Sequence, residues 1–177
     1  MIETPRLILR APGEADRDAI AAINADPRVG DWLGGVRNRA ESDALVHRIQ
    51  ACIAAHGYGF WAAERRENGE LVGLIGLLPI LADSALPFEP CAEIGWRLSP
   101  AAWGQGYAAE GAAAALAWGL AHLDVPEIVS FTARSNLKSQ AVMQRIGLQR
   151  DAARDFDHPN LAQDHPLRPH VVYFKAR

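Results

Sequence analysis

Residues 93–120 read EIGWRLSPAAWGQGYAAEGAAAALAWGL, and this stretch predicts a strand, a tight turn and a helix in succession. Residues 93–98 are largely apolar, Gly104 and Gly106 frame a turn, and an alanine-rich run begins at about residue 107. Glycine disfavours a helix whereas alanine favours one, so the boundary between turn and helix is sharp. The sequence therefore places a helix N-terminus directly behind two glycines.

A helix N-terminus of this kind is suited to binding an anion. Its first-turn N–H groups have no partner within the helix, and the helix dipole adds partial positive charge. Gly104 and Gly106 carry no side chain that would keep a ligand away, so the pattern indicates a cradle for phosphate or pyrophosphate. The alternative is that the glycines only build a tight turn. The GxGxxG dinucleotide pattern fails at Ala109, and no GKS or GKT follows the glycines.

The remaining pattern predicts an α/β fold, with one mixed sheet carrying helices on its faces. A single domain covers residues 1–177. Pro27 is expected to end the first helix, and a loop follows it. The segment 151–160 is either irregular or a ragged strand. The other expected strands cover residues 6–10, 60–65, 71–81, 91–99, 127–133 and 170–176, and the expected helices cover 14–26, 41–57, 107–122 and 136–147.

Composition and charge exclude several classes of protein. The 177 residues are 49% hydrophobic and carry a formal net charge of −3, so the chain has no basic field for nucleic acid. No window has about 18 continuous apolar residues, so no membrane span is expected. The charged N-terminus is no signal peptide, and we expect a cytoplasmic protein. Cys52 and Cys91 are predicted to be free thiols, and no residue cluster predicts a metal site.

The segment EIGWRLSPAAWGQGYAAEG (93–111) resembles the acetyl-coenzyme A binding segment of the GNAT superfamily of N-acetyltransferases. The RimJ/RimL-type branch, which acetylates ribosomal-protein N-termini, is the most similar. TPRLILRAP (4–12) resembles the opening strand of that branch, and NLKSQAVMQRIGL (136–148) resembles its Asn-x-x-Ser helix. The resemblance covers nearly the whole chain. It implies a GNAT fold: a mixed, mostly antiparallel sheet of six to seven strands flanked by about four helices.

The resemblance implies acetyl-CoA as co-substrate. It assigns the pyrophosphate to the glycine turn, the pantetheine arm to the backbone of the preceding strand, and further contacts to the late helix. One residue departs from the family pattern, because Trp103 stands where Gln or Arg is usual. Backbone N–H groups hold the phosphates, so Trp103 need not abolish binding. The implied residues are Gly95, Trp96, Arg97, Leu98, Gly104, Gln105, Gly106, Tyr107, Ala108, Ala109, Asn136 and Ser139. Asn136 also fits the N-cap of its helix.

Acetyl transfer to an amine uses a general base, because an amine is mostly protonated at pH 7. Glu93 is the first candidate, since it begins a largely apolar strand where burial would raise its pKa. Alternatively, it is solvated or paired with Arg97. His158 is the second candidate, together with Asp155 and Asp157, because the resemblance implies a carboxylate soon after the late helix.

The leaving thiolate also needs support. Many GNAT enzymes carry a tyrosine one turn after the position that Ser139 matches, and here that place is Met143. Ser139 is therefore the candidate hydrogen-bond donor to the thiolate. Alternatively, its hydroxyl only bonds back to a helix carbonyl.

The acceptor predicted from these residues is a primary amine. It is either a protein N-terminus or a small-molecule amine such as an aminoglycoside or amino acid. A non-catalytic acyl-CoA-binding regulatory module is the rival interpretation. We expect a monomer or a homodimer, with no nucleic-acid or membrane partner.

Overall fold

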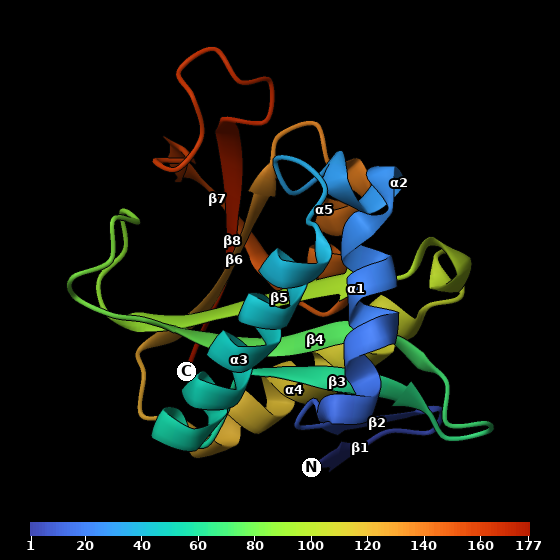
Figure 1. The fold of residues 1–177 in the computed structure, drawn as a ribbon. Coiled ribbons are helices and arrows are strands. Elements are labelled where there is room, and N and C mark those ends of the chain that lie inside the picture. Colours follow the sequence, from blue (N-terminus) through green and yellow to red (C-terminus); the bar gives the residue numbers. More distant parts are fainter.

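The computed structural model describes residues 1–177, and its eight strands form one sheet in the order β1-β2-β3-β4-β5-β6-β8-β7 (Figure 1). Neighbouring strands are antiparallel except for the parallel pair β5 and β6. The strands are β1 (Ile2–Glu3), β2 (Leu7–Arg10), β3 (Phe60–Arg65), β4 (Leu71–Ile80), β5 (Cys91–Leu98), β6 (Glu127–Ala133), β7 (Gln149–Asp157) and β8 (Pro169–Ala176).

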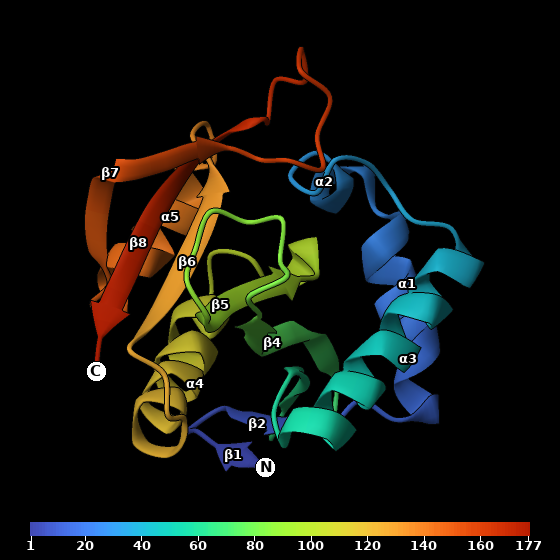
Figure 2. The same ribbon diagram turned by 90° about the vertical axis from the view of Figure 1, so that its left-hand side faces the viewer.

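The helices lie on both faces of this sheet (Figures 1 and 2). On one face, the main core joins α4 to alternate residues of β4 such as Ile75 and Leu77. On the other, Leu74 packs against apolar residues of α1 and α3. No helix is long and apolar enough to span a bilayer. The helices are α1 (Arg17–Ala25), α2 (Pro27–Gly30), α3 (Arg39–His56), α4 (Tyr107–His122) and α5 (Leu137–Arg145).

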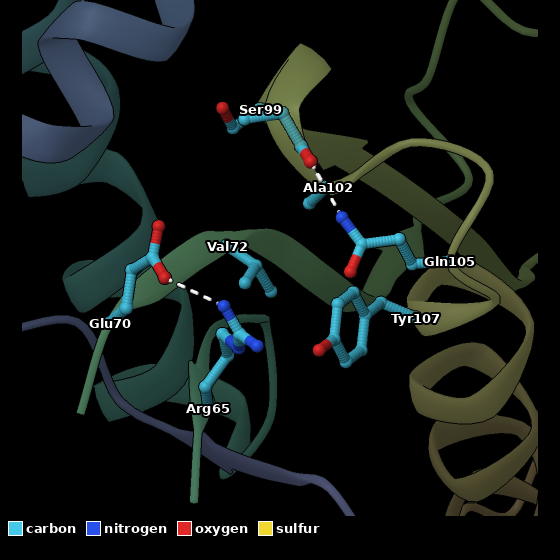
Figure 3. A pocket seen from close by; sticks show the side chains of 8 residues that line it. Arg65, Glu70, Val72, Ser99, Ala102, Gln105 and Tyr107 are labelled. Carbon is cyan, nitrogen blue, oxygen red and sulfur yellow. Dashed lines mark hydrogen bonds and ion pairs between the residues drawn. The ribbon is translucent and has the colours of Figure 1, made fainter. Parts of the chain in front are cut away.

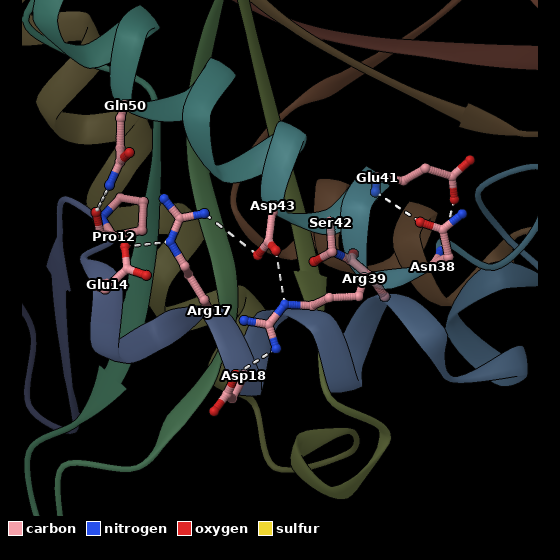
Figure 4. A network of polar contacts seen from close by, with 11 residues as sticks. Pro12, Glu14, Arg17, Asp18, Asn38, Arg39, Glu41, Ser42, Asp43 and Gln50 are labelled. Atoms are coloured by element: carbon pink, nitrogen blue, oxygen red, sulfur yellow. Dashed lines mark hydrogen bonds and ion pairs between the residues drawn. The ribbon is translucent and has the colours of Figure 1, made fainter.

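Polar contacts hold α1 against α3 (Figure 4). Arg39 of α3 donates to Asp18 of α1 at 2.6 Å and to Asp43 of its own helix at 2.9 Å. Arg17 of α1 reaches Asp43 from the other side at 3.5 Å. Because Asp43 joins both arginines, the two helices form one layer over the sheet. This layer places the C-terminal end of α1 beside β5.

The fold class expected from the sequence is confirmed, with one strand and one helix more than expected. The additional strand is β1, which pairs with β2, and the segment around 151–160 is a strand with an irregularity between Asp151 and Phe156. The first helix ends just before Pro27 as expected, but the loop expected after it begins with a short helix, α2. Asp26 accepts a hydrogen bond from the Arg28 amide, so Pro27 begins α2 at a position that tolerates proline.

The sheet opens between β5 and β6. These strands pair only at Ala92 with Ile128 and at Glu93 with Val129, and then they diverge (Figure 2). At the point of divergence the buried Ser130 hydroxyl donates to the Ile94 carbonyl at 2.8 Å. Beyond this bond the backbone groups on the facing edges of β5 and β6 do not pair with each other.

Candidate active site

The free edge of β5 faces the opening. The Ser99 amide donates to the Val72 carbonyl at 2.9 Å, so the facing pair Gly73 and Leu98 is of the non-hydrogen-bonded type. In such a pair the backbone groups point away from the partner strand. The N–H and C=O groups of Leu98, and of Trp96 two residues earlier, therefore point away from β4 into the opening. An extended ligand can add here as a further strand.

The glycine turn presents a row of unpaired amides at the end of β5. Gly104 and Gly106 have φ angles of 75° and 83°, which side chains disfavour. None of the N–H groups of residues 104–109 donates to another group of the chain, and the first helical bond runs from the Glu110 amide to the Gly106 carbonyl. Six consecutive N–H donors at a helix N-terminus suit a pyrophosphate. They belong to Gly104, Gln105, Gly106, Tyr107, Ala108 and Ala109.

Arg6 of the β1–β2 connection holds this turn from behind. Its guanidinium donates to the Gln105 carbonyl at 2.9 Å and to Glu110 at 2.6 Å, and it lies over the Tyr107 ring at 4.5 Å. No sequence pattern singles out Arg6, because its partners Gln105 and Glu110 lie about 100 positions away along the chain. A pocket beside the turn, lined by Tyr107, Gln105 and Arg65 among others, does not include Glu93 (Figure 3).

Trp103 lies across the opening. Its indole N–H donates to the Leu98 carbonyl at 3.0 Å, on the strand edge described above. The ammonium group of Lys138 in α5 lies 5.1 Å from the centre of the same ring. The residue that departs from the family pattern therefore contacts β5 on one side of the opening and α5 on the other.

Helix α5 brings Asn136 and Ser139 to the side of the opening formed by β6. The Asn136 side-chain oxygen accepts a hydrogen bond from the Ser139 amide at 3.1 Å, so Asn136 is the N-cap. The Ser139 hydroxyl makes no hydrogen bond to the protein, and the alternative of a bond to a helix carbonyl is not observed. Met143 is buried in the main core.

Glu93 lies where β5 and β6 part, opposite Val129. Its carboxylate has no hydrogen-bond or ion-pair partner, and the surrounding apolar atoms raise its pKa to about 7. The alternative of a pair with Arg97 is not observed, because Arg97 donates to Asn24 of α1. A partnerless carboxyl with a pKa near neutrality is suited to general-base catalysis.

His158 lies apart from Glu93. Its ring lies 4.8 Å from that of His170 and 6.1 Å from that of Phe131, and it makes no hydrogen bond to Glu93. Burial, with smaller effects of His170 and Arg168, lowers the pKa of His158. The structure therefore does not bring the two base candidates together.

The neighbouring carboxylates of the second group have arginine partners. Asp155 pairs with Arg150 at 2.6 Å, and Asp157 lies 3.4 Å from Arg168. Neither matches Glu93 in lacking a counterion.

Comparison with known proteins agrees with this geometry. A model of the acetyltransferase (GNAT) domain family matches residues 6–149. The FsC-acetyl coenzyme A-N(2)-transacetylase of Aspergillus fumigatus is 32% identical over 152 residues, which cover 83% of this chain and 64% of that protein. The crystal structure of an acetyltransferase from Agrobacterium tumefaciens has a TM-score of 0.78 at 30% identity, covering 99% of this chain and 94% of its own.

The chain thus has the fold of an acetyl-CoA-dependent N-acetyltransferase, with unpaired amides at the helix N-terminus that follows β5. It belongs to the acetyltransferase (GNAT) domain family. The enzyme class and the acetyl-CoA co-substrate expected from the sequence are confirmed.

Proposed function

We propose that this enzyme acetylates a primary amine with Glu93 as the general base. The observation that carries the proposal is the position of Glu93 at the point where β5 and β6 part, without a counterion and with a pKa of about 7. In this proposal acetyl-CoA lies along the free edge of β5 at residues 95–98. Its pyrophosphate accepts hydrogen bonds from the amides of residues 104–109.

The reaction that this arrangement supports is direct transfer. The neutral amine attacks the thioester carbonyl carbon, a carbon–nitrogen bond forms, and the carbon–sulfur bond breaks. Glu93 takes the amine proton, directly or through a water molecule. The unengaged Ser139 hydroxyl donates a hydrogen bond to the departing thiolate. His158 has no step in this scheme because it makes no hydrogen bond to Glu93.

The acceptor and branch belong to the proposal as well. The solved structure of RimL, a ribosomal-protein acetyltransferase in complex with coenzyme A, has a TM-score of 0.73 at 18% identity. A spermidine N-acetyltransferase from Vibrio cholerae reaches 0.74 at 17%. At these identities the likeness supports the fold alone. The acceptor in this proposal is therefore either a protein N-terminus, as in the RimJ/RimL-type branch, or a small-molecule amine. We also propose that residues 1–177 form a single catalytic domain that acts as a monomer or a homodimer.

Kinetics of Glu93→Gln test the proposal. Thiol release from acetyl-CoA is measured with a panel of amines and N-terminal peptides between pH 5.5 and 9. The variant should lose about 10²- to 10⁴-fold in kcat/KM and the acidic limb of the pH profile, while its CoA affinity is unchanged. Glu89→Gln, in the exposed loop before β5, is the matched control. A small loss with the limb intact would remove Glu93 from the role. If no amine or peptide in the panel produces thiol release, the result favours the non-catalytic acyl-CoA-binding module.

A further inference from the structure

Arg97 is a shielded cation without a counterion. Its guanidinium makes one hydrogen bond, to the Asn24 side chain, and its Nε atom is buried without an acceptor. Burial is the main cause that lowers the pKa of Arg97 to about 10, and no carboxylate opposes this effect. An unpaired charge that is shielded from water costs free energy, and a bound anion can remove that cost.

Arg37 adds a second uncompensated charge close by. The Arg37 amide donates to the Asn24 carbonyl at 2.9 Å, and its charge further lowers the pKa of Arg97. The Arg37 side chain is half-buried and forms no hydrogen bond or ion pair. Every other arginine that is shielded from solvent pairs with a carboxylate; these are Arg10, Arg17, Arg65, Arg154 and Arg168.

The two arginines share a face of the sheet with Glu93. Residues at alternate positions of a strand point the same way, so Glu93, Gly95 and Arg97 lie on the face covered by α1. Glu93 and Arg97 are four residues apart, or roughly 13 Å between Cα atoms. Between them Gly95 has no side chain, and the Phe60 ring lies 3.0 Å from where its Cβ would be. The Glu93 Oε1 atom lies 3.7 Å from the same point, so its carboxylate extends over Gly95 toward the end of the strand that carries Arg97.

We propose that Arg97 and Arg37 form an anion-binding subsite for the acceptor, so that the enzyme favours amines that also carry a carboxylate or phosphate group. The acceptor places its amine toward Glu93 and its anionic group on the two guanidinium groups. This inference rests on the proposed function, because it takes the Glu93 end of the face as the reacting end. An anion here accepts charge-assisted hydrogen bonds from the guanidinium groups and balances both charges.

Matched acceptors test the subsite. The pairs are L-leucine and 3-methylbutylamine, 6-aminohexanoate and hexylamine, and O-phosphoethanolamine and ethanolamine. Binding of each is measured by calorimetry to the enzyme loaded with CoA, which cannot react. We expect the anionic member of at least one pair to bind about 10- to 100-fold more tightly, as for a charge-assisted contact. The pair that shows the preference distinguishes carboxylate from phosphate.

Three variants identify the residues responsible. Arg97→Gln and Arg37→Gln should each reduce the preference for the anionic acceptor about tenfold or more. Each should raise KM for that acceptor while changing kcat little. Arg37→Gln guards against loss of folding, because its side chain holds nothing in place. Arg48→Gln, an exposed and unpaired arginine of α3, should leave the preference intact. Equal binding within all pairs, or an unchanged preference in Arg37→Gln and Arg97→Gln, overturns the proposal.

Failure of the subsite and failure of the proposed function give different results. If Glu93 is not the base, Glu93→Gln retains activity, yet the anionic acceptor still binds preferentially to the CoA complex. If the subsite is wrong, amines without an anionic group bind as well as their anionic partners, while the activity still depends on Glu93.

Discussion

The indole nitrogen of Trp103 lies 3.0 Å from the carbonyl oxygen of Leu98, and this bond occupies a backbone acceptor on the strand edge that faces the opening. Neither residue contributes charge, but both lie between the anion cradle and Glu93. The bond therefore competes with a pantetheine arm for the same strand edge.

Trp103→Phe should tighten CoA binding. The ring stays, but the N–H donor is lost and the Leu98 carbonyl becomes available to the ligand. A single neutral hydrogen bond is worth about 0.5–1.5 kcal/mol, so the Kd should fall by about 2- to 12-fold. Calorimetry with CoA gives the value. Weaker CoA binding by Trp103→Phe would contradict this expectation and would mean that the indole N–H contributes to CoA binding.

Gly106→Val should remove most of the stabilisation that CoA gives to the folded protein. The φ angle of 83° disfavours a branched side chain, and the turn that presents the amides is distorted. Saturation at 100 times Kd adds about 2.7 kcal/mol to a native state, measurable as a rise in Tm. Gly57→Val, with a similar φ of 78° at the C-terminal end of α3, is the control for strain. Equal CoA shifts in both variants would contradict the cradle.

Glu93→Gln should make the protein more stable at alkaline pH. The pKa of Glu93 rises from 4.5 to about 7 on folding, so the fold disfavours the ionised carboxyl. This penalty is absent below about pH 4.5, grows as the pH rises to 7 and is complete above that. The variant lacks it and should gain about 1–3 kcal/mol at pH 8, with no gain at pH 4.5. Urea unfolding at both values measures the difference, and equal stability at pH 8 would show that Glu93 is solvated.

Ser139→Ala should lower kcat by about 10- to 100-fold, corresponding to about 1.4–2.7 kcal/mol of transition-state stabilisation. CoA affinity should change little, because the Asn136 cap uses the Ser139 amide and not its hydroxyl. Ser135→Ala, an exposed serine just before α5, is the control. A kcat within twofold of the wild type would leave Ser139 a structural residue.

Local chemistry made much of this site predictable. Glycine and alanine decide the turn at Gly104 and the start of α4, and a side-chain oxygen three residues before an amide marks the Asn136 cap. The loop expected after Pro27 is partly wrong for an equally local reason, because the Asp26 cap makes Pro27 the first residue of α2. For the segment around β7, the sequence does not distinguish an irregular segment from a ragged strand. The pairing of β7 with β8 is interrupted after Asp151, so the strand has features of both.

Contacts between distant segments were beyond the reach of these patterns. Arg6 and Glu110 are 104 positions apart, and neither residue type signals the other. Ser130 looks like an ordinary strand serine, yet its hydroxyl bridges two strands that have ceased to pair. The lack of a counterion at Arg97 depends on three elements at once, β5, α1 and the α2–α3 loop. Such features follow from topology, which periodicity alone does not supply.

The two residue pairs that join β5 to β6 make the sheet two half-sheets with a narrow seam. In the proposed binding mode, the thioester arm adds to β5 along this seam as a ninth strand, so the substrate also becomes part of the sheet. Amide hydrogen exchange at Trp96 and Leu98 of β5 should therefore slow when CoA is added, and it should return to the rate of the free enzyme when CoA dissociates. We therefore expect the sheet to be least rigid between β5 and β6 when no CoA is bound.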